Sequence, residues 1–105
     1  MYFYNYKDFQ NAKLNQKLLW EYDLENFNYD DFRNIVVQRV IERGWHTDWY
    51  FILNYYGING VKEAITEISY LNNKDMNFVS IVFEIPLNQL KCYTKKQLKQ
   101  QHWNS

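Results

Sequence analysis

The sequence predicts an all-α protein, a single compact domain of five to six short helices with helix-turn-helix-like hairpins. Apolar residues recur every three to four positions over most of the chain, which is the period of an amphipathic helix. The chain of 105 residues holds only three Gly and one Pro, too few for the turns of a short-stranded β fold. Its single Cys excludes a disulfide framework.

Aromatic side chains are abundant: ten Tyr, seven Phe and four Trp make up 20% of the chain. Together with 47% hydrophobic residues, they exclude intrinsic disorder over most of its length. A single core of this size cannot fully bury that many rings. No apolar run approaches the roughly 18 residues of a membrane span. The start carries no secretory signal, so we expect a cytoplasmic protein without a membrane partner.

Charge and composition divide the chain into three parts. The 12 acidic residues all lie at or before Glu84, so residues 1–90, with eight basic residues, carry a net charge of −4. We expect an N-terminal aromatic arm over 1–13 that docks on the body, and a helical domain over 14–93. A basic C-terminal helix or tail is expected over 94–105.

The first elements of the helical domain are expected to be a short helix over Leu14–Trp20 and a loop over Tyr22–Tyr29. The most regular helix follows, between Asp30 as N-cap and Gly44 as C′ residue. Its apolar positions at helical spacing are Phe32, Ile35, Val36, Val40 and Ile41.

The next helix, which Thr47 is expected to cap and Gly57 to end, is apolar all round. One face carries Trp49, Ile52, Leu53 and Tyr56, and the other carries Tyr50, Phe51 and Tyr55. Such a helix is buried centrally or packs on two neighbours, of which one can belong to another chain. Because protein interfaces enrich aromatic residues, we predict a partner-binding site formed by Tyr50, Phe51, Tyr55 and Trp45.

Two further helices are predicted beyond this point. Asn59-Gly60 is expected to form an interhelix turn before an amphipathic helix that reaches Leu71. Asn73 is expected to cap the next helix, and Pro86 to stop it, because the residue before a proline avoids the α region.

The C-terminal part is expected to hold one helical turn over Leu87–Leu90 and then a basic helix. Thr94–Gln97 matches a capping box, from which the basic helix would reach about Trp103. Weak contacts to nucleic acid are assigned to Lys95, Lys96 and Lys99.

The hairpin formed by His46–Gly57 and Gly60–Leu71 has the outline of a helix-turn-helix. A DNA-binding transcriptional regulator is therefore the alternative function. Its second helix, however, presents Glu63 and Glu67 beside Lys62, and glutamates repel phosphates. We expect nucleic-acid binding to be absent, or weak and driven by the tail.

Signatures of catalysis are missing from the sequence: there is no Gly-rich phosphate loop and no nucleophile elbow. Neither His46 nor His102 has a Cys or a carboxylate at a spacing that is typical of metal ligands. Cys92 has three lysines nearby that could lower its pKa, but a lone Cys is more often a small packed side chain. We therefore predict a protein that is not an enzyme and takes no cofactor or metal.

Three stretches resemble a known family: LLWEYDLENFNYDDFRNIVVQRVIERG (18–44), DWYFILNYYGINGVKEAI (48–65) and NFVSIVFEIPLNQLKCY (77–93). They are similar to small uncharacterised bacterial proteins catalogued as a domain of unknown function. The shared motifs fall at Trp20–Asp23, Ile35–Gly44, Asp48-Trp49, Tyr56-Gly57 and Ile85–Cys92. Where the family often has an Arg-rich segment, this chain has Tyr70–Lys74.

Genes of that family often lie beside one for an abortive-infection-type nucleotidyltransferase toxin. The resemblance therefore implies an antitoxin that neutralises such a toxin by direct binding. The protein partner would be the toxin, or a second copy of the chain in a homo-oligomer. A third possibility is a housekeeping interaction module with no toxin link.

Overall fold

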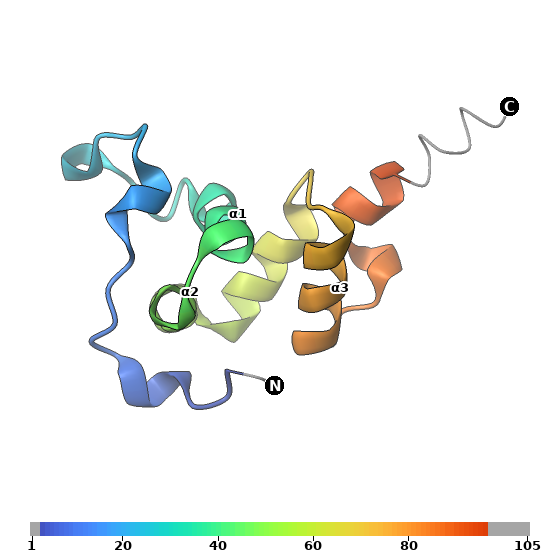
Figure 1. The fold of residues 1–105 in the computed structure, drawn as a ribbon, viewed down its shortest axis with the longest axis horizontal. Helices are drawn as coiled ribbons and strands as arrows, with labels where there is room; N and C mark the ends of the chain where they lie inside the picture. The colour runs from blue at the N-terminus through green and yellow to red at the C-terminus, as the bar shows by residue number, and fades with distance from the viewer. Residues whose placement is uncertain (1–2, 97–105) are drawn as a thin grey trace, which may run out of the picture.

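The computed structural model describes residues 3–96, and within this range the protein is all-helical, without a strand (Figure 1). Its α-helices are α1 (Arg33–Arg43), α2 (His46–Glu67), α3 (Asn73–Val82) and a helix over 91–96. Four short 3₁₀ turns connect them: η1 (Tyr6–Phe9), η2 (Gln16–Leu19), η3 (Leu24–Asn26) and η4 (Leu87–Gln89). The all-α prediction is confirmed. The described range holds four α-helices, however, whereas five to six helices were expected.

The count differs because α2 combines two helices that the sequence pattern separates. Asn59-Gly60 lies inside α2 and is not an interhelix turn. The only break is Gly57, whose φ of 78° and ψ of 164° are accessible to glycine at little cost. The chain thus changes direction at one residue, and the two halves of α2 run differently in Figure 1. The helices expected over 14–20 and 87–90 are only 3₁₀ turns.

Helix α1 begins later than predicted and also ends one residue later, because Gly44 is its C-cap, with a φ of −75°, and not the C′ residue. Its first residue is Arg33, while Asn28 Oδ1 accepts the backbone N–H groups of Asp30 and Asp31 at 3.0 and 3.1 Å. Asp30 is therefore not the N-cap. At the other end Gly44 N–H donates to Val40 O at 2.8 Å. A Cβ at Gly44 would lie 2.6 Å from that oxygen, so a side chain would clash.

The other helix ends also differ from the predictions by one to four residues. Helix α2 begins at His46, and the Asp48 carboxylate, not Thr47, accepts the Trp45 N–H at 2.8 Å. The cap of α3 is Asn72 rather than Asn73, because its side chain accepts the Asp75 N–H. Helix α3 ends at Val82, before Glu84 adopts a φ of 55°, and therefore four residues short of Pro86.

The predicted capping box at Thr94–Gln97 is wrong in its position. The last helix already begins at residue 91, so Thr94 lies inside it and donates its hydroxyl to Lys91 O at 3.0 Å. Gln97 and the expected continuation to Trp103 lie outside the described residues.

The core lies between α1, α2 and α3. Its fully buried side chains are Leu19, Val36, Val37, Val40, Ile52, Leu53, Val61, Ala64, Ile65, Leu71, Val79 and Leu90. Trp49 is 5% exposed and packs its ring 5.7 Å from Phe83 and 5.9 Å from Phe78. This tryptophan therefore joins α2 to α3, as its position on the apolar face predicts.

The N-terminal segment lies against the first half of α2. Phe3, Tyr6 and Phe9 are three residues apart, and backbone bonds from Tyr6 N to Phe3 O and from Asp8 N to Asn5 O give the segment 3₁₀ character. With three residues per turn, the three rings fall on one side. Asn54 Nδ2 donates to Tyr6 O at 2.9 Å and to Phe9 O at 3.3 Å, which fixes the segment on α2.

Polar contacts hold the N-terminal turns and helix ends together. The buried Asp48 carboxylate also accepts Asn15 N–H at 2.7 Å, and so ties the segment before η2 to α2. Arg39 donates to Leu18 O at 3.0 Å and pairs with Glu21. The hydrogen bond from Arg39 lowers the pKa of Glu21.

Candidate protein-binding surface

The four predicted partner-binding residues do not form one site. Tyr50 turns to the N-terminal segment, where its ring stacks on Phe9 with centroids 4.3 Å apart. Phe51 and Tyr55 stack on each other at 5.6 Å on another side of α2. Trp45 precedes α2 and is 74% exposed. The chain itself thus covers much of the second aromatic face of α2.

A cluster of rings from residues 22–32 covers Phe51 and Tyr55. Tyr29 lies 5.9 Å from Phe51 and 5.7 Å from Tyr55, between ring centroids. The Tyr56 hydroxyl donates to Tyr29 O at 2.6 Å, and burial raises the pKa of Tyr56. Tyr55 keeps 48% of its surface exposed, so this cluster is only partly open to a partner.

Trp45 instead forms part of a hollow between the N-terminal segment, α2 and α3. The hollow has a volume of about 320 Å³ and is lined by Phe3, Gly44, Trp45, His46, Trp49 and Phe78. Five of these six residues carry rings. Phe3 of the N-terminal segment and Phe78 of α3 come from elements that are distant in the sequence. We call it the tryptophan hollow.

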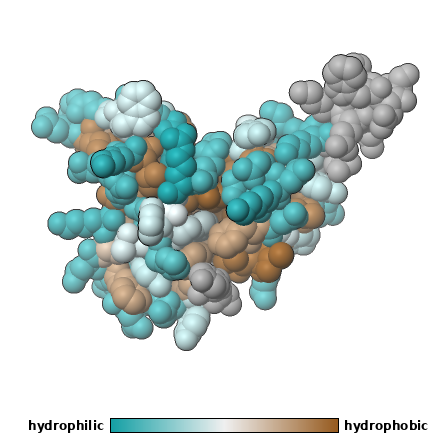
Figure 2. All heavy atoms as spheres, viewed as in Figure 1, coloured by the Kyte–Doolittle hydropathy of each residue, from teal (hydrophilic) through white to brown (hydrophobic). Residues whose placement is uncertain are grey.

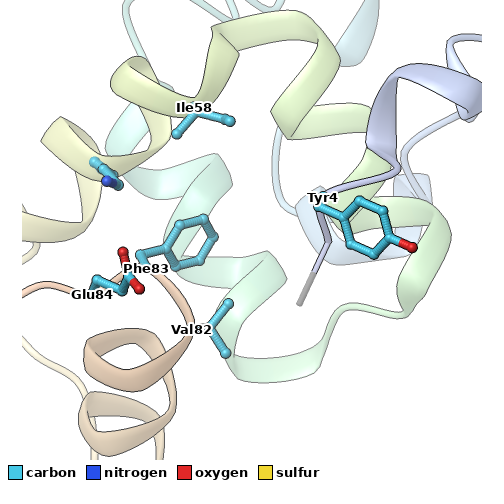
Figure 3. A pocket seen from close by; sticks show the side chains of 6 residues that line it. Tyr4, Ile58, Val82, Phe83 and Glu84 are labelled. Carbon is cyan, nitrogen blue, oxygen red and sulfur yellow. The ribbon is translucent and has the colours of Figure 1, made fainter. Parts of the chain in front are cut away.

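A second hollow of about 260 Å³ lies at the end of α3, and we call it the tyrosine hollow. Figure 3 shows Tyr4 of the N-terminal segment across from Ile58, Val82 and Phe83. Lys62 and Glu84 complete the lining and supply one charge of each sign. The two hollows are neighbours, because Phe3 and Tyr4 are adjacent and Phe83 packs on Trp49.

The same elements carry exposed apolar side chains. Ile81 is 77% exposed and Tyr4 is 79% exposed. Figure 2 shows hydrophobic side chains gathering at the surface over the lower end of α3. We refer to the two hollows and these side chains together as the arm–α3 groove. Exposed apolar patches of this kind often mark binding sites.

Sequence reasoning missed Phe78 and Ile81, although their spacing is informative. The core face of α3 carries the buried Met76 and Val79. Phe78 and Ile81 are three residues apart and therefore lie on the same side of the helix. This side is not the core face. An apolar pair outside the core face is the signal that could have found this surface.

Two of the lysines predicted to contact nucleic acid, Lys95 and Lys96, lie in the helix over 91–96. Lys95 is exposed, while Lys96 is partly buried and reaches back to α3, where its Nζ lies 3.0 Å from Asn73 Oδ1. Lys99 and His102 lie outside the described residues.

Metal-ligating side chains do not gather into a metal site within 3–96. No group of three or more His, Cys, Asp or Glu side chains is placed to hold a metal ion there. Cys92 is buried, and burial raises the pKa of its thiol, which outweighs the nearby Lys96. The thiol is thus a packed side chain. No helix in the same range is long and apolar enough to cross a membrane.

The fold and surface define a small all-helical domain with an aromatic groove. Residues 14–65, just under half of the chain, match the model of a family of unknown function, DUF6922. The match covers η2, η3, α1 and most of α2, and agrees with the expected resemblance to a domain of unknown function. A search of curated proteins found no match, and a search of solved structures found none.

Proposed function

We propose that this chain is a non-enzymatic protein-binding module whose partner docks in the arm–α3 groove. The observation that carries the proposal is the exposure of Trp45, which lines one of two hollows, and of Ile81 on α3, the helix that contributes Phe78 to one hollow and Val82 to the other. Interface hot spots are typically large aromatic side chains that enter or surround such pockets.

The partner that the family resemblance implies is a nucleotidyltransferase-like toxin, and the role would be that of an antitoxin. A mostly apolar groove with only Lys62 and Glu84 at its rim suits a partner element with an apolar ridge. The antitoxin would then act by covering a surface of the toxin.

The helix-turn-helix alternative finds less support. The second half of α2, the expected recognition helix, presents Glu63 and Glu67, which bind Arg33 at 3.2 and 3.0 Å. Carboxylates on this side would repel DNA phosphates, and Arg33 is already engaged by them. We therefore retain protein binding as the proposed function.

The test is copurification with the product of the neighbouring reading frame, using Trp45→Ser combined with Ile81→Ser. Trp20→Ser is the matched control, since Trp20 is 75% exposed and lines neither hollow. The proposal expects the double variant to lose the partner and the control to keep it. Retention by both variants would contradict it. If the double variant instead loses self-association, the face binds a second copy and not a toxin.

A further inference from the structure

A strip of lysines lies where the last helix meets the start of α3. Lys96 Nζ is 5.5 Å from the centroid of the Tyr70 ring and 3.0 Å from Asn73 Oδ1. Lys91 and Lys95 are both exposed and, four residues apart in a helix, lie on the same side of it. Lys74, next to Asn73, is exposed as well.

These four lysines form a positive surface without an ion pair to the described residues. Within residues 3–96, no carboxylate forms an ion pair with Lys74, Lys91, Lys95 or Lys96; the ion pairs there are those of Arg33 and Arg39. Two acidic groups interact electrostatically with the strip: Asp75 with Lys74, and Glu67, which also bonds to Arg33 and Asn34, with Lys91. The strip therefore contrasts with the acidic body, and the sequence adds Lys99 beyond it.

An exposed aromatic ring lies at the edge of this strip. Tyr70 keeps 58% of its surface exposed, although its neighbour Leu71 is fully buried in the core. Gln38 Nε2 donates to Tyr70 O at 3.1 Å, so the backbone that carries the ring is fixed on α1. The ring is thus positioned by the fold and presented to solvent beside the lysines.

We propose that this strip binds the backbone of single-stranded nucleic acid, with Tyr70 as a stacking platform for a base. Sites for single strands combine a lysine or arginine track with aromatic rings, and bind with little sequence preference. An acidic protein surface would also match the lysines, and competition by polyglutamate distinguishes that partner from a nucleic acid. The strip contains Lys95 and Lys96, two of the three lysines predicted to contact nucleic acid, and adds residues from two other segments. It is separate from the arm–α3 groove.

The experiment is fluorescence anisotropy of the full chain with labelled oligo-U RNA and oligo-dT DNA of about 12 nucleotides, within the usual site sizes. Four lysine–phosphate contacts predict a slope of log K against log salt of about −3 for a single strand. Binding should therefore weaken about 50-fold between about 50 and 200 mM salt. The two oligonucleotides distinguish RNA from DNA as the preferred strand.

Matched variants test the position of the site. Lys91→Gln, Lys95→Gln and Lys96→Gln together should reduce the magnitude of the slope by about 2. Lys7→Gln, Lys13→Gln and Lys17→Gln change the net charge equally at exposed sites elsewhere, and should leave affinity nearly unchanged. Tyr70→Leu should weaken binding at least about fivefold through lost stacking.

Three outcomes would overturn the proposal. The first is equal loss of affinity in both lysine triples, which would show attraction by net charge alone. The second is binding that tolerates Tyr70→Leu and is competed equally well by polyglutamate, which would assign the strip to an acidic protein. The third is no saturable binding at about 50 mM salt.

Discussion

The ring of Phe3 stacks on the indole of Trp49, with centroids 5.0 Å apart and planes inclined by 16°. Phe3 is 46 positions from Trp49 in the sequence, and both rings line the tryptophan hollow. The N-terminal segment therefore contributes both to the core and to the candidate binding surface.

Removing the Phe3 ring should destabilise the whole domain. Truncating a buried Phe to Ala typically lowers the free energy of unfolding by about 3–5 kcal/mol. Because Phe3 lies near the end of the chain, we expect a loss at the lower limit of this range. Tyr4→Ala is the adjacent control, because Tyr4 is exposed and should change stability by less than about 0.5 kcal/mol. Urea denaturation measures both values, and equal effects would mean that the segment does not dock as described.

Trp49 is the residue whose loss should affect the core most. It contacts Phe3, Phe78 and Phe83, which belong to two elements packed on α2. Trp49→Ala should cost about 3–5 kcal/mol, a large part of the stability of a small domain. A thermal melt within a few degrees of the wild-type protein would show that the helix is oriented differently.

The direction change inside α2 should depend on Gly57. Its φ of 78° with ψ of 164° is a conformation nearly restricted to glycine, so Gly57→Ala should cost about 1–3 kcal/mol. Gly60, three residues on, lies within α2 at ordinary backbone angles, and Gly60→Ala should change stability by less than about 1 kcal/mol. Comparable losses in the two variants, measured by denaturation, would argue against a special role of Gly57.

The buried Cys92 thiol should resist modification in the folded protein. Burial raises the pKa of the Cys92 thiol in the folded protein. The stabilising contribution of the protonated thiol is therefore complete below its unfolded-state pKa of about 8.5. It is lost as the pH rises through the folded-state pKa. At pH 8 an aromatic disulfide reagent should label the native protein roughly tenfold or more slowly than the denatured protein. Equal rates would contradict the burial.

The sequence pattern predicts α1 and its terminal Gly44 well, because a 3.6-residue period needs only local information. It does not predict how the second face of α2 is covered. The covering segments, residues 3–9 and 22–32, lack that period, since Phe3, Tyr6 and Phe9 follow the three-residue period of a 3₁₀ turn. Their docking depends on contacts between residues 27 to 48 positions apart, such as Tyr56 with Tyr29 and Asn54 with Tyr6.

The candidate site was predicted only in part for the same reason. Trp45 lies in the arm–α3 groove, whereas Tyr50, Phe51 and Tyr55 are drawn into two intrachain clusters. The remaining groove residues come from the N-terminal segment, from both halves of α2, and from α3 and its end. Only the folded chain brings them beside Trp45.

The central claim, that the arm–α3 groove is the partner-binding surface, is tested most directly by the Kd of the copurified partner for three variants. Calorimetry should show that Trp45→Ala and Ile81→Ala each lose at least about 2 kcal/mol, or about 30-fold in Kd, as hot-spot residues do. Trp20→Ala, at matched exposure, should bind as the wild-type chain does. Wild-type affinity in the two groove variants, or an equal loss in Trp20→Ala, would contradict the claim.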